Sequence, residues 1–488
     1  MKLQHATFGI VLAIFGSAFA FGQVGPAYGA HVPQFVTTGQ VVNASSLSMS
    51  TPPITLTMPG SAWMKVWFGG ADLPNGSFVR VEGILDGFHQ DLDVDAYEKW
   101  EGTSCYFNGD SVRVSLQLPP FSTGFVTISG VDAGFPSVVG IDSICGATDD
   151  RVPTAETRIG RLLNSGGSAI CSGGLISANG VFMTAGHCIG GNQYTVEFNC
   201  PPSTVSGAVV HPSPINQYPA DSASLAYTNG GIGNDWAAFR LFSNTTSGLS
   251  APSVQGFYNR ATSIPLIGST TRISGFGTGA GVQNQAPTTH TGGLSLVSGT
   301  RLEYTVDTTG GNSGSCVVNE ASQLVFGIHT NAGCTASGGA NSGTSILNSG
   351  LQAHLATIIQ VPGIHQVSVS QIGAAGNPIT VAVTDAPPFS EVVNALSFVT
   401  TQPLGTGPFF GLGAGAGSGD LFFPFTLPVG VAPFHVMVDG SGDFSVTIPS
   451  AGSFGTFTFD IVSIAFNPSI GYAGYLGRSA VVRATIVL

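Results

Sequence analysis

The sequence contains very little charge. Only 8% of its 488 residues are Asp, Glu, Lys or Arg, against roughly 25% in an average soluble protein. The chain has three lysines and a net charge of −12 at pH 7. Nucleic-acid binding needs clustered Lys and Arg to neutralise phosphates. The composition therefore excludes that class, and it predicts a surface covered by Ser, Thr, Asn, Gln and Gly.

Long hydrophobic runs are also missing, so no membrane span is predicted. One short apolar run, FGIVLAIFGSAFA, follows Lys2 and ends in Ala18-Phe19-Ala20. A positive start, a short apolar stretch and an A-x-A site are typical of a secretory signal peptide. We expect residues 1–20 to be that peptide, and the protein to be secreted to the extracellular space or the cell envelope.

Cysteines are few, and none forms a C-x-x-C pair, which excludes a zinc ribbon or a thioredoxin-like motif. In an oxidising compartment disulfides are expected, with an odd cysteine left over. The seven are Cys105, Cys145, Cys171, Cys188, Cys200, Cys316 and Cys334. We predict neither a metal nor a cofactor.

Residues 24–146 are predicted to form a β-sandwich module. FVRVEGIL and SVRVSLQL alternate polar and apolar residues, and Asn-Gly turn sequences occur near them. This pattern is typical of half-buried antiparallel strands joined by tight turns. The three aspartates of DLDVDAYE (Asp91 to Glu98) suggest a calcium loop. However, the glycine and the distal glutamate of such a loop are missing, so a strand that carries them on one face is favoured.

A polar stretch, GATDDRVPTAETRIGRL, is expected to link this module to a domain at residues 152–361. That domain is predicted to end in a helix at residues 350–360, before Val361-Pro362-Gly363. Residues 364–488 return to short strands and predict a second β-sandwich module. Either module could bind a polymer or a cell surface, and the lone histidines His89, His365 and His435 are expected to be structural or exposed.

Three segments of the middle domain can carry chemistry. They are FMTAGHC (Phe182 to Cys188), GNDWAAFRL (Gly233 to Leu241) and TTGGNSGS (Thr308 to Ser315), in that order. A serine becomes nucleophilic when an imidazole accepts its proton, and a carboxylate must orient that imidazole. Fixed N–H donors must also stabilise the developing oxyanion.

These segments resemble the chymotrypsin-like serine endopeptidases, whose triad runs His, Asp, Ser along the chain. The resemblance covers residues 159–360 and implies a double β-barrel that hydrolyses peptide bonds. It implies that His187 is the general base, Asp235 orients it and Ser313 is the nucleophile. Gly311 and Ser313 would supply the oxyanion N–H groups.

Competing residues and classes remain. Asp221 could replace Asp235, and His211 could replace His187. Ser342 is an alternative to Ser313 as the nucleophile, because its segment GGANSG partly repeats the serine motif. An inactive protease-like binding or adhesion protein is a second hypothesis, although all three triad residues are present. An α/β-hydrolase is not favoured, because its triad order and its elbow around the serine differ.

The resemblance also implies a disulfide between Cys171 and Cys188, which would tether the loop carrying His187. A Cys105–Cys145 bond would lie within the N-terminal module. A Cys316–Cys334 bond would staple the serine loop to the pocket wall, with Cys200 as an alternative partner of Cys334.

Asp307, Thr308 and His329 are the candidate residues for substrate specificity. Asp307 lies six residues before Ser313, where trypsin-like enzymes place the carboxylate that binds Arg or Lys. TTGGNSGS followed by FGIHTNAGC resembles the bacterial glutamyl endopeptidases, which match Thr308 and His329 at the positions that hold a substrate carboxylate. An imidazole and a hydroxyl can both donate to a carboxylate. We therefore expect cleavage after Glu or Asp, with Arg or Lys as the alternative.

Activation is the last expectation. Asn312 stands where zymogen-activated relatives carry an aspartate that pairs with a new N-terminus. Arg158 before Ile159 looks like a trypsin-type activation site. Because Asn cannot form that ion pair, cleavage there is predicted not to be required.

Overall fold

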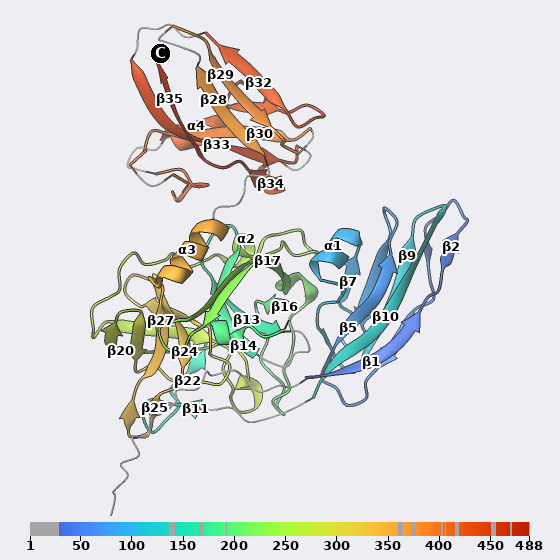
Figure 1. Cartoon of the computed structure of the whole chain (residues 1–488). Helices are drawn as coiled ribbons and strands as arrows, with labels where there is room; N and C mark the ends of the chain where they lie inside the picture. Colours follow the sequence, from blue (N-terminus) through green and yellow to red (C-terminus); the bar gives the residue numbers. More distant parts are fainter. Residues whose placement is uncertain are drawn as a thin grey trace, which may run out of the picture. The chain divides into compact units, whose positions relative to one another are not determined.

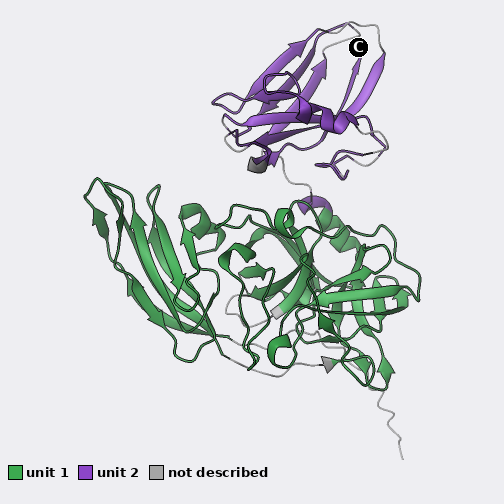
Figure 2. Ribbon diagram, turned by 180° about the vertical axis from the view of Figure 1, so that it is seen from behind, with its two compact units in different colours: residues 1–355 green, residues 356–488 purple. Residues whose placement is uncertain are grey.

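The computed structural model describes most of the chain. The described residues are 29–135, 142–164, 170–191, 193–359, 365–371, 376–387, 389–401, 404–405, 407–414, 419–449, 455–468 and 471–487. The predicted signal peptide lies outside them. The chain divides into two compact units, Met1–Leu355 and Ala356–Leu488 (Figure 2). Both are mainly β, as expected.

The N-terminal part of the first unit contains two antiparallel sheets. One consists of β1 (Gly29–Thr37), β10 (Ser122–Gly134), β5 (Trp63–Asp72), β8 (Phe107–Asn108) and β2 (Val41–Asn43). The other consists of β3 (Met49–Ser50), β9 (Ser111–Leu118), β6 (Phe78–Gly83), β7 (His89–Leu92) and β4 (Ile54–Thr57). Alternate residues of both sheets, such as Val66, Val79 and Val114, share one buried core. This is the layered arrangement that period-2 alternation predicts.

The segment Asp91 to Glu98 does not form the expected strand. β7 ends at Leu92, and a short helix, α1 (Val94–Lys99), follows. Asp93 caps this helix by accepting from the N–H of Ala96 at 2.8 Å, and Asp91 pairs with Arg80 at 2.7 Å. Helix capping by an aspartate competes with continued strand pairing.

The first six-stranded barrel follows. Its closed order is β13 (Ile159–Asn164), β14 (Ile170–Leu175), β15 (Val181–Thr184), β18 (Asp235–Leu241), β17 (Gln217–Asn229) and β16 (Tyr194–Glu197). Phe182, Phe198 and Phe239 fill its interior.

The second barrel also closes on itself, because β20 pairs with both β19 and β21. Its order is β20 (Thr288–Ser298), β19 (Thr270–Gly275), β23 (Cys316–Asn319), β24 (Val325–Asn331), β27 (Asn341–Ser345) and β21 (Arg301–Tyr304). The helix after it, α3 (Ser349–Ile358), lies within two residues of its predicted position. The two barrels confirm the predicted double-barrel fold (Figure 1).

The stretch expected to be a linker is instead paired with the second barrel. β11 (Asp142–Ser143) pairs with β22 (Thr308–Thr309), and β12 (Val152–Pro153) pairs with β20. Polar composition alone had suggested a free segment, but its backbone groups pair with residues far along the chain.

The N-terminal module contacts the first barrel through buried aromatic and polar groups. The Tyr106 ring stacks on His211 with ring centres 4.6 Å apart. Gln217 donates to the carbonyl of Tyr106 and accepts from its N–H, both at 2.8 Å. Lys65 is fully buried near Gln193, and burial lowers its pKa to about 8.

The second unit has two sheets of its own. One contains β28 (Gln366–Gln371), β29 (Ile379–Thr384) and β32 (Phe444–Ile448). The other contains β31 (His435–Met437), β30 (Glu391–Ser397), β33 (Thr456–Phe466), β34 (Tyr475–Arg478) and β35 (Val482–Val487). Val367, Ile379 and Ile461 lie in one core between them, and α4 (Gly419–Thr426) packs on β30.

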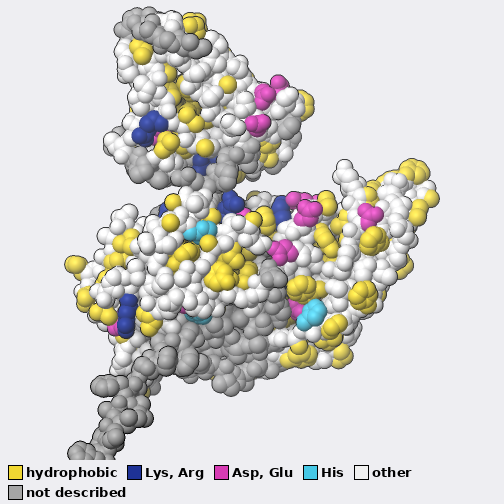
Figure 3. All heavy atoms as spheres, in the orientation of Figure 1, with side chains coloured by type: hydrophobic (Ala, Val, Ile, Leu, Met, Phe, Trp, Pro, Cys, Tyr) yellow, Lys and Arg dark blue, Asp and Glu magenta, His cyan; other side chains and the backbone are white. Residues whose placement is uncertain are grey.

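Charged side chains are sparse on the described part of the face shown in Figure 3. Among the described residues, no helix has the length and apolar character needed to cross a membrane.

Candidate active site

The two barrels place three predicted residues together. His187 lies in η2 (Gly186–Cys188), directly after β15, and Asp235 begins β18. β15 and β18 are neighbours in the first barrel, so the end of one strand lies beside the start of the other. Ser313 comes from the loop between β22 and β23 of the second barrel.

These side chains form a continuous line of hydrogen bonds. His187 Nδ1 lies 2.5 Å from Asp235 Oδ2, and His187 Nε2 lies 2.8 Å from Ser313 Oγ. The backbone N–H of His187 also donates to Asp235 Oδ1 at 2.9 Å. A carboxylate can only accept, so Nδ1 carries the proton and Nε2 can accept one from the Ser313 hydroxyl.

The backbone before Ser313 turns sharply at Gly311, whose φ is +101°. A Cβ added there would lie 2.5 Å from the carbonyl oxygen of Phe276. Among the described residues, the N–H groups of Gly311 and Ser313 make no hydrogen bond. Two adjacent donors in one turn are thus available to an anionic oxygen.

Asn312 stabilises this turn from within it. Its side-chain oxygen accepts from the N–H of Thr309 at 3.0 Å. Ile159 pairs with Gly174 inside the first barrel, and the carbonyl of Arg158 accepts from Leu175. The bond between Arg158 and Ile159, which resembles an activation site in sequence, therefore lies at the start of barrel strand β13.

The competing residues have other partners. Asp221 pairs with Arg240 at 2.9 Å. His211 lies 2.6 Å from one oxygen of Glu197, and Arg161 lies 2.7 Å from the other. Burial lowers the pKa of His211, and the Glu197 charge opposes that shift.

His329 lies in β24, beside the serine turn, where its carbonyl accepts from Gly314 at 2.7 Å. Its Nδ1 lies 2.8 Å from the hydroxyl of Tyr304. Burial, assisted by the nearby His187, lowers the pKa of His329 to about 3. The ring is therefore neutral at ordinary pH, and the Tyr304 hydroxyl is one of its partners.

Asp307 is turned away from solvent, and its side chain is fully buried. One carboxylate oxygen accepts from the N–H of Cys145 at 2.7 Å, and the other accepts from the N–H of Asp150 at 2.9 Å. Thr308 is buried, and its hydroxyl oxygen accepts from the Asn341 amide at 2.9 Å.

The disulfides agree with only one of the predicted pairs. Cys171 is bonded to Cys188 as expected. The predicted bonds Cys105–Cys145, Cys316–Cys334 and Cys200–Cys334 are wrong, because Cys145 is bonded to Cys334 across 189 residues of sequence.

The other cysteines are buried apart from one another. Cys105 lies in the core of the N-terminal module, and Cys316 points toward Gly174 of the first barrel. Burial raises the pKa of Cys200 and of Cys316 to about 12. Buried thiols of this kind are unreactive.

Two features near the site escaped the sequence analysis: residues 142–150 and Tyr304. The pairing of β11 with β22 and the Cys145–Cys334 bond join segments remote in sequence. The cysteine content predicts disulfides, but the connectivity cannot be deduced from the sequence alone.

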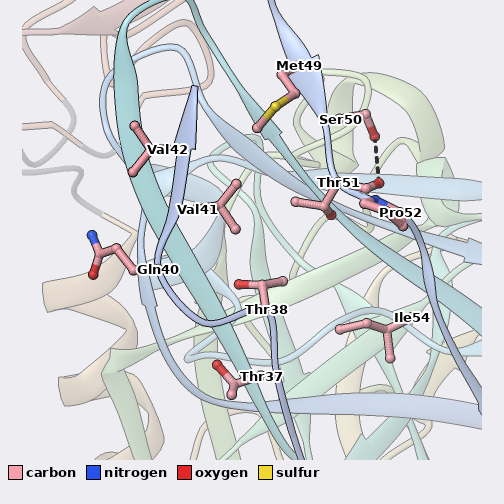
Figure 4. A pocket seen from close by; sticks show the side chains of 10 residues that line it. All are labelled: Thr37, Thr38, Gln40, Val41, Val42, Met49, Ser50, Thr51, Pro52 and Ile54. Carbon is pink, nitrogen blue, oxygen red and sulfur yellow. Dashed lines mark hydrogen bonds between the residues drawn. The ribbon is translucent and has the colours of Figure 1, made fainter. Parts of the chain in front are cut away.

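A cavity of about 500 Å³ lies elsewhere, in the N-terminal module. Val41, Met49 and Ile54 are among its lining side chains (Figure 4). None of the triad or pocket residues lines it, so it is not part of the site.

Comparison with known families agrees with the site geometry. Residues 148–347 match the family model described as Trypsin. This part of the chain is a trypsin-like serine endopeptidase domain. The matched residues include His187, Asp235 and Ser313, whereas β11 and Cys145 precede them.

Solved structures similar to the chain include other proteases. A Glu endopeptidase in complex with MPD is 21% identical, with 44% of this chain and 98% of that chain covered and a TM-score of 0.35. The thermostable serine protease AL20 from an extremophilic microorganism is 19% identical, with coverages of 41% and 96% and a TM-score of 0.34. The VesB protease of Vibrio cholerae is 12% identical, with coverages of 69% and 99% and a TM-score of 0.31. No curated protein matches the chain.

Proposed function

We propose that the protein is a secreted endopeptidase that uses His187, Asp235 and Ser313 to cleave peptide bonds after Glu, and less well after Asp. The observation that carries the proposal is the continuous hydrogen-bonded line from Asp235 through His187 to Ser313. An inactive binding protein would not need this line, so the adhesion alternative is disfavoured.

Each residue has a defined role in the proposed mechanism. Ser313 Oγ attacks the peptide carbonyl carbon while His187 Nε2 accepts its proton. Asp235 stabilises the imidazolium that forms, and the N–H groups of Gly311 and Ser313 hold the oxyanion. The imidazolium then protonates the leaving amine, an acyl-enzyme remains, and water releases the acid by the same steps in reverse.

The preference for an acidic side chain is supported by His329. The His329 ring lies beside the serine turn, and the N–H of a neutral imidazole can donate to a carboxylate. Thr308 adds a hydroxyl, which is a second kind of group that can donate to a carboxylate.

The alternative preference for Arg or Lys needs Asp307 as an acceptor. Because both of its oxygens accept from backbone N–H groups in a fully buried position, a cationic side chain would have to displace those bonds. The geometry therefore favours the acidic preference.

The test uses casein and two matched chromogenic peptides that end in Glu or Arg. Wild type is expected to hydrolyse casein and to turn over the Glu peptide faster, and Ser313→Ala is expected to hydrolyse neither. Equal casein hydrolysis by Ser313→Ala would remove the triad assignment. Faster turnover of the Arg peptide would assign the pocket to Asp307, and a preference unchanged in His329→Ala would leave that histidine a packing residue.

We also expect activity without cleavage at Arg158–Ile159, because Asn312 is already held within its own turn. A form that retains the residues before Ile159 should react with an organophosphonate serine probe. Reaction only after cleavage at that bond would overturn the expectation.

A further inference from the structure

Arg151 belongs to the segment before the first barrel, yet its side chain is buried beside the serine turn. The segment is held there because β12 follows directly and pairs with β20. Only 7% of the Arg151 side chain is exposed. Asp149 balances its charge by accepting from Nε at 2.9 Å and from Nη2 at 2.8 Å. A guanidinium has five N–H donors, so this ion pair leaves other donors for the turn.

The other hydrogen bonds of Arg151 join Thr309, at the start of the turn, to Thr278. Nη1 donates to Thr309 Oγ1 at 2.7 Å, and Nη2 donates to the carbonyl of Thr278 at 3.0 Å. The Thr309 hydroxyl donates to the same carbonyl at 2.9 Å. Arg151 therefore adds two charge-assisted bonds to a contact that the two threonines also make directly.

Thr278 and Thr309 hold the peptide bond between Gly310 and Gly311. The N–H of Thr278 donates to the carbonyl of Gly310 at 2.7 Å. The carbonyl of Thr309 accepts from the N–H of Asn312 at 3.0 Å, which closes the turn around the two glycines. In a trans peptide the C=O and the N–H point in opposite directions. Holding the Gly310 carbonyl on Thr278 therefore turns the N–H of Gly311 to the other side, where it stays available to an oxyanion.

Close packing at Gly277 brings the guanidinium next to Asn312. A Cβ added to Gly277 would lie 2.4 Å from Arg151 Nη1, 2.4 Å from Thr309 Oγ1 and 2.2 Å from Asn312 Oδ1. The three side chains thus converge on one point beside the turn. Asn312 stands where zymogen-activated relatives carry an aspartate that pairs with a new N-terminus. Here the neighbouring cation belongs to the uncleaved chain.

We propose that Arg151 is a positioning residue for the oxyanion hole. It holds Thr278 and Thr309, and through them it fixes the peptide whose N–H belongs to Gly311. The inference rests on the proposed function, because the oxyanion concerned forms when Ser313 attacks the substrate. It also gives a physical reason why the turn stays ordered without a new N-terminus.

The test compares wild type with Arg151→Ala and Arg151→Lys, all in the full chain. Arg158→Ala is the matched control, because Arg158 pairs with Glu156 at the same two-residue spacing as Arg151 with Asp149. Among the described residues, its side-chain hydrogen bonds all go to Glu156. Three quantities are measured: kcat and KM for a Glu peptide, the rate at which an uncharged fluorophosphonate reacts with Ser313, and the melting temperature.

In Arg151→Ala, kcat and the phosphonylation rate should both fall about tenfold, the effect of losing a hydrogen bond to a charged group. KM should stay within about twofold, since a group that acts only on the transition state changes kcat. Arg151→Lys keeps the charge but lacks the planar fork that meets both acceptors, so it should recover part of the lost rate. Arg158→Ala should leave both rates within about twofold of wild type.

Four results would overturn the inference. They are a phosphonylation rate in Arg151→Ala within about twofold of wild type, an equal loss in Arg158→Ala, a loss confined to KM, and no recovery in Arg151→Lys. If melting shows that Arg151→Ala does not fold, Arg151→Lys carries the test, and wild-type rates in that variant would overturn the inference. Failure of the proposed function is separately visible, because wild type would then not be phosphonylated at Ser313.

Discussion

At the scale of single residues, the roles of two aspartates can be separated. Asp235 accepts two hydrogen bonds from His187, whereas Asp221 pairs with Arg240 on the same barrel. Both lie in β17 or β18 and are largely buried. They therefore form a matched pair for testing which carboxylate orients the imidazole.

If Asp235 orients His187 as proposed, Asp235→Asn is expected to lower kcat by roughly 10⁴-fold, as the same change does in a Ser-His-Asp enzyme, because an amide favours the wrong imidazole tautomer. Asp221→Asn should leave kcat within about twofold of wild type, since it touches no reacting group. Steady-state kinetics on the Glu peptide measures both. A larger loss in Asp221→Asn would reassign the carboxylate.

The neutral state of His329 gives a prediction about pH. Its pKa is lowered to about 3 by burial, so the ring stays uncharged from about pH 5.5 to pH 8 and the substrate Glu stays ionised there. The ratio of kcat/KM for Glu over Gln peptides should therefore be flat across that range. With an ordinary pKa the ring would gain charge as pH falls through about 6.5, and the ratio would rise. A rise on acidification would contradict the assignment of a neutral donor.

At the scale of elements, the serine turn depends on a backbone conformation that few residues adopt. Gly311 has φ +101° and faces the carbonyl of Phe276, whereas Gly299 has φ +59° in a turn with open space around it. A side chain at Gly311 would be strained and would also collide with backbone.

Gly311→Ala is expected to lower kcat by about 10²-fold or more, the usual effect of losing one oxyanion donor. Gly299→Ala shares the strain of a positive φ but lacks the collision, so it should lower stability by about 1 kcal/mol and leave kcat unchanged. Kinetics together with thermal melting distinguishes the two. Normal kcat in a folded Gly311→Ala would show that this N–H is not needed.

The motifs and the strand-rich architecture could be predicted because they are local. FMTAGHC, GNDWAAFRL and TTGGNSGS each place one residue type at a fixed point of a strand or turn, and alternating apolar residues predict strands. In the structure these segments do bring His187, Asp235 and Ser313 within hydrogen-bonding distance.

The features that could not be predicted depend on contacts between distant segments. Cys145 was assigned to Cys105 by closeness in sequence, but its partner Cys334 lies 189 residues away. Asp307 lies six residues before Ser313, where trypsin-like enzymes place a substrate-binding carboxylate. Only the fold shows that the backbone N–H groups of Cys145 and Asp150 bind both of its oxygens. The polar composition of residues 142–150 did not predict that β11 pairs with β22.

At the scale of the whole molecule, the chain consists of two compact units with separate hydrophobic cores. Separate cores favour separate unfolding transitions. The N-terminal module and the barrels, in contrast, share buried contacts such as those between Tyr106, His211 and Gln217.

Calorimetry of the full chain should therefore show a transition that is reproduced by the isolated fragment 361–488. Ser313→Ala, which prevents self-digestion, is the suitable background. Melting of the full chain in one transition, together with an unfolded fragment, would show that the second unit depends on the first.

The most direct test of the central claim is covalent labelling with a phosphonate that carries a Glu-like side chain, followed by peptide mapping of the modified residue. Labelling is expected on Ser313 alone, to be lost in His187→Ala, and to be faster than labelling by the Arg-like analogue. Modification of Ser342 or of another serine would contradict the account. So would a preparation that degrades protein although the phosphonate does not react with its Ser313.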